Sequence, residues 1–153
     1  MVEITSKNAA RQTFMPLMRE LVRAYQAFSH YSADGFRLSG SSLTQPQADV
    51  IFTLGNTEGM TFKEIGDKTL ITKGTLTGII DRLEGKKLVK RRTDKHDRRR
   101  IMVRLTRRGE RLFDTEFPRQ IIWMKEKFSK LSKKDRDEAI RVLGLIREAF
   151  EAE

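Results

Sequence analysis

The chain has 153 residues, 38% of them hydrophobic and none of them cysteine, which suits one compact domain and excludes disulfides, thiolate metal sites and cysteine redox switches. No apolar run reaches the roughly 18 residues of a membrane span, and the N-terminus lacks the apolar core of a signal peptide, so we expect a soluble, cytoplasmic protein. The formal charge of +10 comes from 31 basic and 21 acidic residues, and it favours a polyanionic partner.

The N-terminal third predicts a helix, a loop and a second helix. Apolar residues at spacings of three and four predict an amphipathic helix over residues 9–31. The Ser- and Gly-rich stretch 32–42 predicts a loop. Thr44, with Gln47 three residues on, has the spacing of a capping box and opens a short helix that stops within 56–59.

The middle of the chain has the pattern of a helix-turn-helix. Thr61 and Glu64 repeat the capping-box spacing and begin a helix of about two turns over 61–69. Thr72 is a further N-cap candidate, directly before an amphipathic helix over 73–87. Two short helices joined by a turn of about three or four residues are typical of a helix-turn-helix.

A β-hairpin with a charged tip follows. Residues 88–92 and 101–105 contain β-branched residues in short runs, and the sequence TDKHDRRR lies between them. Thirteen basic and three acidic residues lie between Arg82 and Arg108, so this segment carries the whole excess of positive charge. Clustered Lys and Arg bind phosphates by releasing condensed counterions, which favours nucleic acid over a solvated face or a membrane-surface patch.

Two further helices complete the chain. Thr106 caps a long helix that Pro118 bends or breaks, and Ser132, with Asp135 in the first turn, opens the last helix. Long apolar stripes at both ends of the chain exceed what one small head covers, so we predict an isologous dimer between the terminal helices.

The second helix of a helix-turn-helix enters the major groove, and its N-terminal residues reach base edges. Lys73 suits guanine acceptors, Gly74 permits close backbone approach, and Thr75 and Thr77 suit phosphates or a thymine methyl group. The alternative is that these four are ordinary solvent-facing residues of a helix.

The hairpin tip suits a narrow, electronegative minor groove beside that helix. It offers Lys95, His96, Arg98 and Arg99, and Asp97 orients a neighbouring arginine rather than contacting an anion. The predicted DNA-binding residues are Thr72, Lys73, Gly74, Thr75, Thr77, Arg82, Lys95, Asp97, Arg98 and Arg99.

The segments DRLEGKKLVKR and DRRRIMVRLTRRG resemble the recognition-helix exit and wing of the MarR family of winged helix-turn-helix transcription regulators. The wing motif is Asp97, Arg99, Val103, Leu105 and Thr106. The resemblance implies an obligate homodimer with interlocking terminal helices and two winged heads that straddle a palindromic operator. It also implies a repressor. By position, the start of the recognition helix would meet the major groove, and Arg99, positioned by Asp97, the minor groove.

The predicted fold class is therefore mainly α with a small β-hairpin wing, a winged helix-turn-helix head plus N- and C-terminal dimerisation helices. We place one MarR-like domain at 1–153, with the head at about 44–108 and the dimerisation helices at about 9–31 and 107–151. We expect a sequence-specific DNA-binding regulator. The alternative is a non-specific architectural DNA-binding protein that uses the same basic segment.

Members of the family often respond to small aromatic or phenolic compounds, to cysteine oxidation or to metal. Cysteine sensing is excluded, and two histidines, one of them in the wing, make a poor metal site. We expect no metal and no cofactor. A pocket for a small aromatic effector has as its candidate lining Tyr25, His30, Tyr31, Phe52 and Trp123, with ordinary core aromatics as the alternative.

An enzyme is the first rival class, and it needs a nucleophile with a base, a carboxylate pair, a metal cluster or a phosphate loop. The sequence has no GxxxxGK[ST], HExxH or GxSxG motif, so we predict no catalytic residues. A winged-helix protein adaptor is a further rival, and it predicts no salt-dependent DNA binding.

Overall fold

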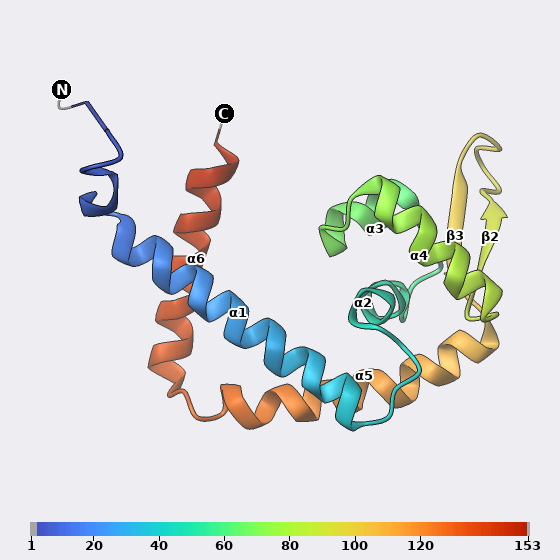
Figure 1. The fold of residues 1–153 in the computed structure, drawn as a ribbon. Helices are drawn as coiled ribbons and strands as arrows, with labels where there is room; N and C mark the ends of the chain where they lie inside the picture. Colours follow the sequence, from blue (N-terminus) through green and yellow to red (C-terminus); the bar gives the residue numbers. More distant parts are fainter. Residues whose placement is uncertain (1–2, 153) are drawn as a thin grey trace.

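The computed structural model describes residues 3–152, so residues 1, 2 and 153 of the predicted domain lie outside the described part of the chain. The described residues form α-helices and a three-stranded antiparallel sheet (Figure 1). The elements in chain order are the 3₁₀ turn η1 (Ala9–Arg11), α1 (Met15–Leu38), α2 (Gln45–Leu54), β1 (Met60–Thr61), α3 (Phe62–Thr69), α4 (Lys73–Gly85), β2 (Val89–Thr93), β3 (Ile101–Leu105), α5 (Arg107–Phe128) and α6 (Lys133–Glu151).

The predicted helix-turn-helix and hairpin are confirmed as α3, α4, β2 and β3. The capping box of α3 is reciprocal, because the backbone N–H of Thr61 donates to Glu64 Oε2 (2.7 Å) and the Glu64 N–H donates to Thr61 Oγ1 (3.2 Å). Thr106 and Ser132 also accept backbone N–H groups as N-caps of α5 and α6. Thr72 occupies the N-cap position of α4, but its hydroxyl donates to Thr75 Oγ1 (3.1 Å).

The predicted bounds of the first helix, 9–31, were wrong at both ends, and the predicted loop over 32–42 is confirmed only at residues 39–42. Helix α1 begins at Met15 and continues to Leu38. Gly35 lies so close to α5 that a Cβ there would stand 2.7 Å from Trp123 Cδ1. The small residues in this stretch therefore permit close contact between two helices. Their Ser- and Gly-rich composition is also typical of a loop, and for this reason the sequence predicted one.

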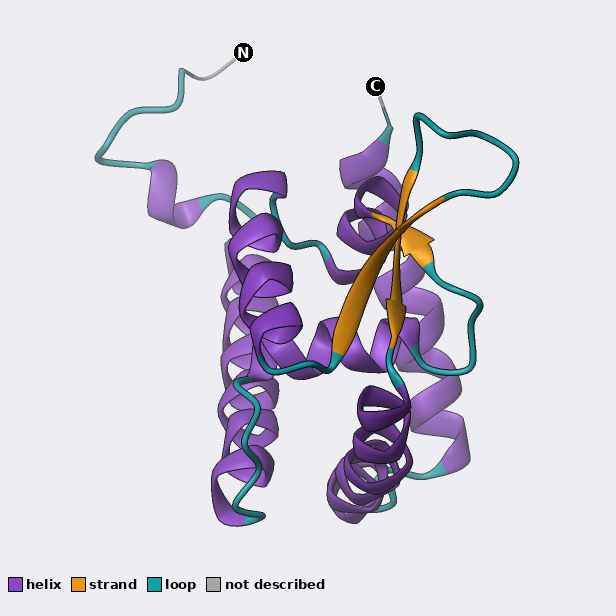
Figure 2. Cartoon of the chain, turned by 90° about the vertical axis from the view of Figure 1, so that its right-hand side faces the viewer, coloured by secondary structure: helices purple, strands orange, loops and turns teal. Residues whose placement is uncertain are grey.

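The sheet has the strand order β1–β3–β2, with Val103 of β3 paired to Met60 on one side and to Arg91 on the other. The short strand β1 was not expected, because two residues carry no alternation pattern. It ends at Thr61, which is also the N-cap of α3, so the sheet is joined directly to the helix-turn-helix. Figure 2 shows the loop between β2 and β3 extending clear of the helices as a wing.

The hydrophobic core lies in the head, between α2, α3, α4 and the sheet. A fully buried side chain contributes roughly 1.5–3 kcal/mol, so these positions hold the helix-turn-helix together. The largest side chains with almost no exposure are Val50, Ile51, Leu54, Ile65, Leu76, Ile80, Leu83, Val89 and Val103.

Helix α5 leaves the head directly after β3 and runs to the terminal helices (Figure 1). Its start is fixed to the head, because Thr106 Oγ1 donates to the carbonyl of Lys87 (2.7 Å). Pro118 lies inside this helix, which continues on both sides of it, so the break considered above does not occur.

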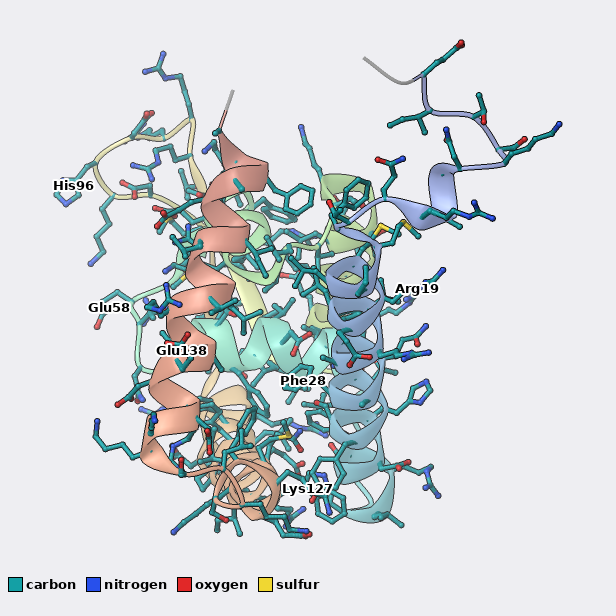
Figure 3. All side chains as sticks on the ribbon, turned by 90° about the vertical axis from the view of Figure 1, so that its left-hand side faces the viewer. Arg19, Phe28, Glu58, His96, Lys127 and Glu138 are labelled. Atoms are coloured by element: carbon teal, nitrogen blue, oxygen red, sulfur yellow. The ribbon has the colours of Figure 1, made fainter. Side chains whose placement is uncertain are left out.

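The terminal helices leave their apolar side chains exposed in the single chain. Helix α6 has no buried residue, and Ile140 and Phe150 are 71% and 82% exposed. Phe28 and Arg19 lie on different sides of α1 (Figure 3). Within residues 3–152, the helices are too short or too polar to cross a lipid bilayer. The large exposed apolar residues of α1, α5 and α6 are Leu17, Met18, Val22, Tyr25, Phe28, Leu38, Ile121, Ile122, Phe128, Ile140, Leu143, Leu145 and Phe150.

Candidate nucleic-acid interface

Helix α4 packs one face against the core of the head and exposes the opposite face to solvent. Leu76, Ile79, Ile80 and Leu83 recur at helical spacing and are buried in the head. The positions directly before Leu76, and Thr77 after it, lie off this buried face and are exposed. They include the predicted major-groove residues Lys73, Gly74, Thr75 and Thr77, and Arg82 further along the helix is exposed as well.

The first turn of α4 has an open surface. A Cβ on Gly74 would meet nothing within 4 Å, so the backbone here is accessible to a close partner. The Thr77 hydroxyl donates to the carbonyl of Lys73 (3.1 Å), which turns its proton toward the helix and leaves its oxygen lone pairs and methyl group outward. These groups suit the phosphate and base-edge contacts predicted from the sequence.

Asp94 organises the tip of the wing. Its Oδ1 accepts the backbone N–H groups of His96 (2.7 Å) and Asp97 (3.0 Å), an Asx turn. These bonds, the one from His96 first, lower the pKa of Asp94. The tip closes where the Asp94 N–H donates to the carbonyl of Arg100 (2.9 Å). His96 lies at the outer end of the loop and points away from the head (Figure 3).

Asp97 and Arg99 form the contact that the sequence suggested. Asp97 Oδ1 accepts the Arg99 backbone N–H (3.0 Å) and its side-chain Nε–H (3.3 Å). The Arg99 side chain is nevertheless 92% exposed. Its guanidinium therefore extends into solvent, while its backbone is held by the bond to Asp97. Lys95 and Arg98 are also exposed on this loop. The wing thus presents cations, and its aspartates bond to the loop itself.

The start of α4 and the wing share one concave surface. A groove of about 870 Å³ lies between α3, the start of α4 and the wing, and Lys73, Arg99 and Arg100 are among its lining residues. Arg100 also lies 3.8 Å from Glu64 of α3, which links the wing to the helix-turn-helix. The structure therefore brings Lys73, predicted for the major groove, and Arg99, predicted for the minor groove, to one groove of the head.

Two basic residues of the charged segment are instead bonded within the head. Lys86 Nζ donates to the Ser42 carbonyl (2.8 Å) and to Gln47 Oε1 (3.2 Å), which ties the end of α4 to the start of α2. Arg91 donates to Asp81 and Glu84 of α4. Composition does not separate these inward residues from the others. The signal that points to the partners of Arg91 is the pair Asp81 and Glu84, which are three residues apart on the preceding helix.

The structure separates the predicted effector residues, and only Tyr31 and Trp123 are in contact with each other. Tyr31 and Trp123 stack with ring centroids 4.8 Å apart, and Trp123 Nε1–H donates to the Tyr31 carbonyl (2.9 Å). The Tyr31 hydroxyl donates to Glu126 Oε2 (3.1 Å). Partial burial, and then this bond, raise the pKa of Tyr31, whereas bonds from Lys127 and Tyr31 lower the pKa of Glu126.

The structure does not bring the other three effector residues to this pair. Phe52 belongs to an aromatic cluster of the head, with its ring centroid 5.1 Å from that of Phe117 and 6.4 Å from that of Phe113. Tyr25 is 69% exposed on α1, and His30 is exposed there too. A cavity of about 470 Å³ beside the α1–α5 contact includes Trp123 in its lining. Across residues 3–152, no three His, Cys, Asp or Glu side chains gather as metal ligands do.

The helix-turn-helix, the wing beside it and the cations gathered on their common face define a winged helix-turn-helix fold with a basic face. The model of the MarR family matches residues 41–100, which contain the helix-turn-helix and most of the wing. The head of the chain is therefore similar to MarR-family proteins, and its relatives include HTH-type transcriptional regulators.

Relatives and solved structures agree with this assignment. The chain is 36% identical over 95 residues to the HTH-type transcriptional regulator TtmR of Methylorubrum extorquens, an alignment that covers 61% of this chain and about half (49%) of TtmR. AbsC, a MarR family transcriptional regulator from Streptomyces coelicolor, has the same fold over the full length of both chains, with a TM-score of 0.80 at 21% identity. BpsR of Bordetella bronchiseptica, whose DNA binding is regulated by 6-hydroxynicotinic acid, matches with a TM-score of 0.71 at 25% identity, over 86% of this chain and 98% of BpsR.

Proposed function

We propose that the protein is a sequence-specific repressor that binds a palindromic operator as a homodimer. The observation that carries the proposal is the groove shared by the start of α4 and the wing, which puts Lys73 and Arg99 on one face. In this arrangement α4 reads the major groove, and Arg99 enters the adjoining minor groove, where a narrow groove concentrates negative potential. The other predicted contacts lie near these two residues in the chain: Thr72, Gly74, Thr75, Thr77 and Arg82 on or beside α4, and Lys95, Asp97 and Arg98 in the wing.

The proposed head comprises about residues 44–108, and the proposed dimerisation helices are α1 near the N-terminus and α5 and α6 within 107–151. Exposed apolar side chains of α1, α5 and α6 support this division, because contiguous apolar faces of this kind mark interaction surfaces. In a homodimer, one two-fold contact with a second copy covers the exposed apolar side chains at both ends of the chain. The two-fold axis then relates two heads, and this symmetry makes the operator palindromic.

The test is a selection of random DNA duplexes by the purified protein near physiological salt, followed by sequencing of the bound pool. We expect a palindrome with half-site centres about one helical turn, 10–10.5 bp, apart. Affinity for the selected duplex should exceed that for a scrambled duplex by roughly a thousandfold or more at the same salt concentration. Binding without an enriched motif, lost steeply as salt rises, would instead establish the architectural alternative.

We further propose that a small aromatic acid releases the operator by binding in the cavity beside Trp123. The cavity is also lined by Arg119, whose guanidinium lies 3.2 Å from Glu116, and an aromatic acid offers a ring to the indole and a carboxylate to that guanidinium. Such an effector acts only if it binds the DNA-incompetent arrangement of the heads more tightly than the competent one.

Trp123 is the single tryptophan of the chain, so its fluorescence reports on this cavity directly. We expect 6-hydroxynicotinic acid, the regulator of BpsR, to change the fluorescence in a saturable way and to release bound operator over the same concentration range. A saturable change without release would make the cavity a binding site but not a regulatory one. An unchanged spectrum would refute the proposed site for this compound.

A further inference from the structure

One arginine of the basic segment is turned into the head. Arg91 lies on β2, and its side chain is 29% exposed, whereas that of Arg99 is 92% exposed. Its guanidinium donates through one nitrogen to Asp81 and through another to Glu84, both on α4. The same group lies over the ring of Phe62 at the start of α3, with Cζ 5.5 Å from the ring centroid. One side chain thus joins the wing strand to both helices of the helix-turn-helix.

The contact fixes orientation as well as distance. The backbone N–H of Arg91 donates to Glu84 Oε1 (3.1 Å), so the backbone and side chain of one residue hold both oxygens of one carboxylate. A planar guanidinium that bridges two carboxylates and stacks on a ring has few alternative orientations. A lysine ammonium at this position has neither the planar shape nor the spread of donors to make all three contacts.

The contact also removes charge where a polyanion approaches. Asp81 and Glu84 are the only acidic residues of α4, and both are paired with Arg91. The bond that Arg91 donates to Asp81, and then the bond that it donates to Glu84, raise the pKa of Arg91, so its guanidinium stays charged. Without Arg91, two carboxylates of the recognition helix would be free near the phosphates.

We propose that Arg91 is a positioning residue for DNA recognition, which sets α4 relative to the wing by holding Asp81 and Glu84 and does not itself contact DNA. This inference rests on the proposed function. It assigns Arg91 a role different from the direct DNA contact proposed for Lys95, Arg98 and Arg99 of the same basic segment.

The proposal makes a prediction of unusual sign. Removal of an acidic residue from a DNA-binding face ordinarily strengthens binding to a polyanion. Glu84→Gln should weaken operator binding instead, by roughly tenfold, the scale of one lost charge-assisted hydrogen bond. Arg91→Gln should weaken it at least as much, and the double variant should lose no more than Arg91→Gln alone, because both changes remove one tie.

The operator affinities of these three variants and of the unmodified protein form a double-mutant cycle. Tighter binding by Glu84→Gln, or losses that add in the double variant, would overturn the proposal, because Arg91 would then act independently of Glu84. Should Arg91→Gln fail to fold, Asp81→Asn and Glu84→Gln keep the test open, since those side chains are 58% and 38% exposed.

A second measurement needs no DNA. The chain has no cysteine, so Thr77→Cys and Thr93→Cys place spin labels on α4 and β2 without background labelling. We expect Arg91→Gln to broaden the distance distribution between the labels, in samples diluted with unlabelled protein. Arg92→Gln, which removes the same charge from the next, exposed position of β2, should leave it narrow.

The two measurements separate the possible failures. If the unmodified protein selects no operator, the proposed function fails, and the label distances still test the tie between wing and helix. If the operator binds and the Arg91→Gln and Glu84→Gln variants match the unmodified protein in affinity and in label distances, the role of Arg91 alone is refuted.

Discussion

The substitution Arg99→Ala separates the contribution of the wing to DNA binding from its contribution to the fold. The side chain is 92% exposed, and its side-chain bond within the head is the 3.3 Å contact with Asp97. Exposed pairs of this kind contribute about 0–1 kcal/mol, so the free energy of unfolding should change by no more than that.

The effect on the operator should be far larger. A groove contact by one side chain is worth about 1–3 kcal/mol, and a dimer inserts two copies of Arg99. The loss of both amounts to about 2–6 kcal/mol, which is roughly thirtyfold to more than ten-thousandfold in the dissociation constant. Fluorescence anisotropy with the selected operator measures this loss, and thermal unfolding and sedimentation of the same sample measure the fold and the dimer.

Arg23→Ala is the matched control. Arg23 lies on α1 and is 72% exposed, so its removal deletes the same charge far from the wing. An equal loss of affinity in both variants would show that net charge, not groove insertion, carries the binding. A lower melting temperature or a dissociated dimer in Arg99→Ala alone would refute the placement of this residue on an exposed tip.

Three further predictions concern stability, pH and assembly. Gly109→Ala places a Cβ 2.0 Å from the Leu88 carbonyl oxygen and should cost about 1–3 kcal/mol or more in thermal unfolding. Gly85→Ala, where a Cβ meets nothing within 4 Å, should melt no lower than the unmodified protein, and equal melting of both variants would contradict the clash. Two backbone amides lower the pKa of Asp94 in the folded protein. Its carboxylate therefore stabilises the wing tip at pH values above the usual aspartate pKa of about 3.9, and this contribution is lost as the pH falls through the lower pKa of the folded state. An NMR titration midpoint at or above that usual value would exclude the Asx turn in solution. Ile140→Glu charges the exposed apolar face of α6 and should yield monomers in sedimentation, whereas a persistent dimer would move the interface elsewhere.

Local signals explain why most of the fold was predictable from the sequence. Thr61, Thr106 and Ser132 are N-caps whose hydroxyls satisfy backbone N–H groups within three residues, so their effect needs no tertiary context. The strand Ile101–Leu105 has exactly the predicted bounds, because its alternation was the clearest of the two hairpin strands. Of the candidate site, the residues alone predicted only that Asp97 orients a neighbouring arginine, and the resemblance to the MarR wing motif implied that this arginine is Arg99.

Contacts between distant segments were beyond prediction. Residues 32–38 have the composition of a loop, and they are helical because Gly35 packs against Trp123, a partner 88 positions away. The sequence likewise counts Arg91 as one more surface cation, although its partners lie seven and ten positions earlier on a different element. The proposed effector residues were grouped by their aromatic character, and the fold assigns Phe52 to the core of the head instead.

The unbroken course of α5 through Pro118 has a mechanical consequence. Its 22 residues span about 33 Å at 1.5 Å per residue, with the head at one end and the terminal helices at the other. A rotation of about 6° at the far end therefore displaces the head by roughly 3.4 Å, the rise of one base pair. The helix can therefore act as a lever arm, which turns a small rotation among the terminal helices into a displacement of the head on the scale of one base pair.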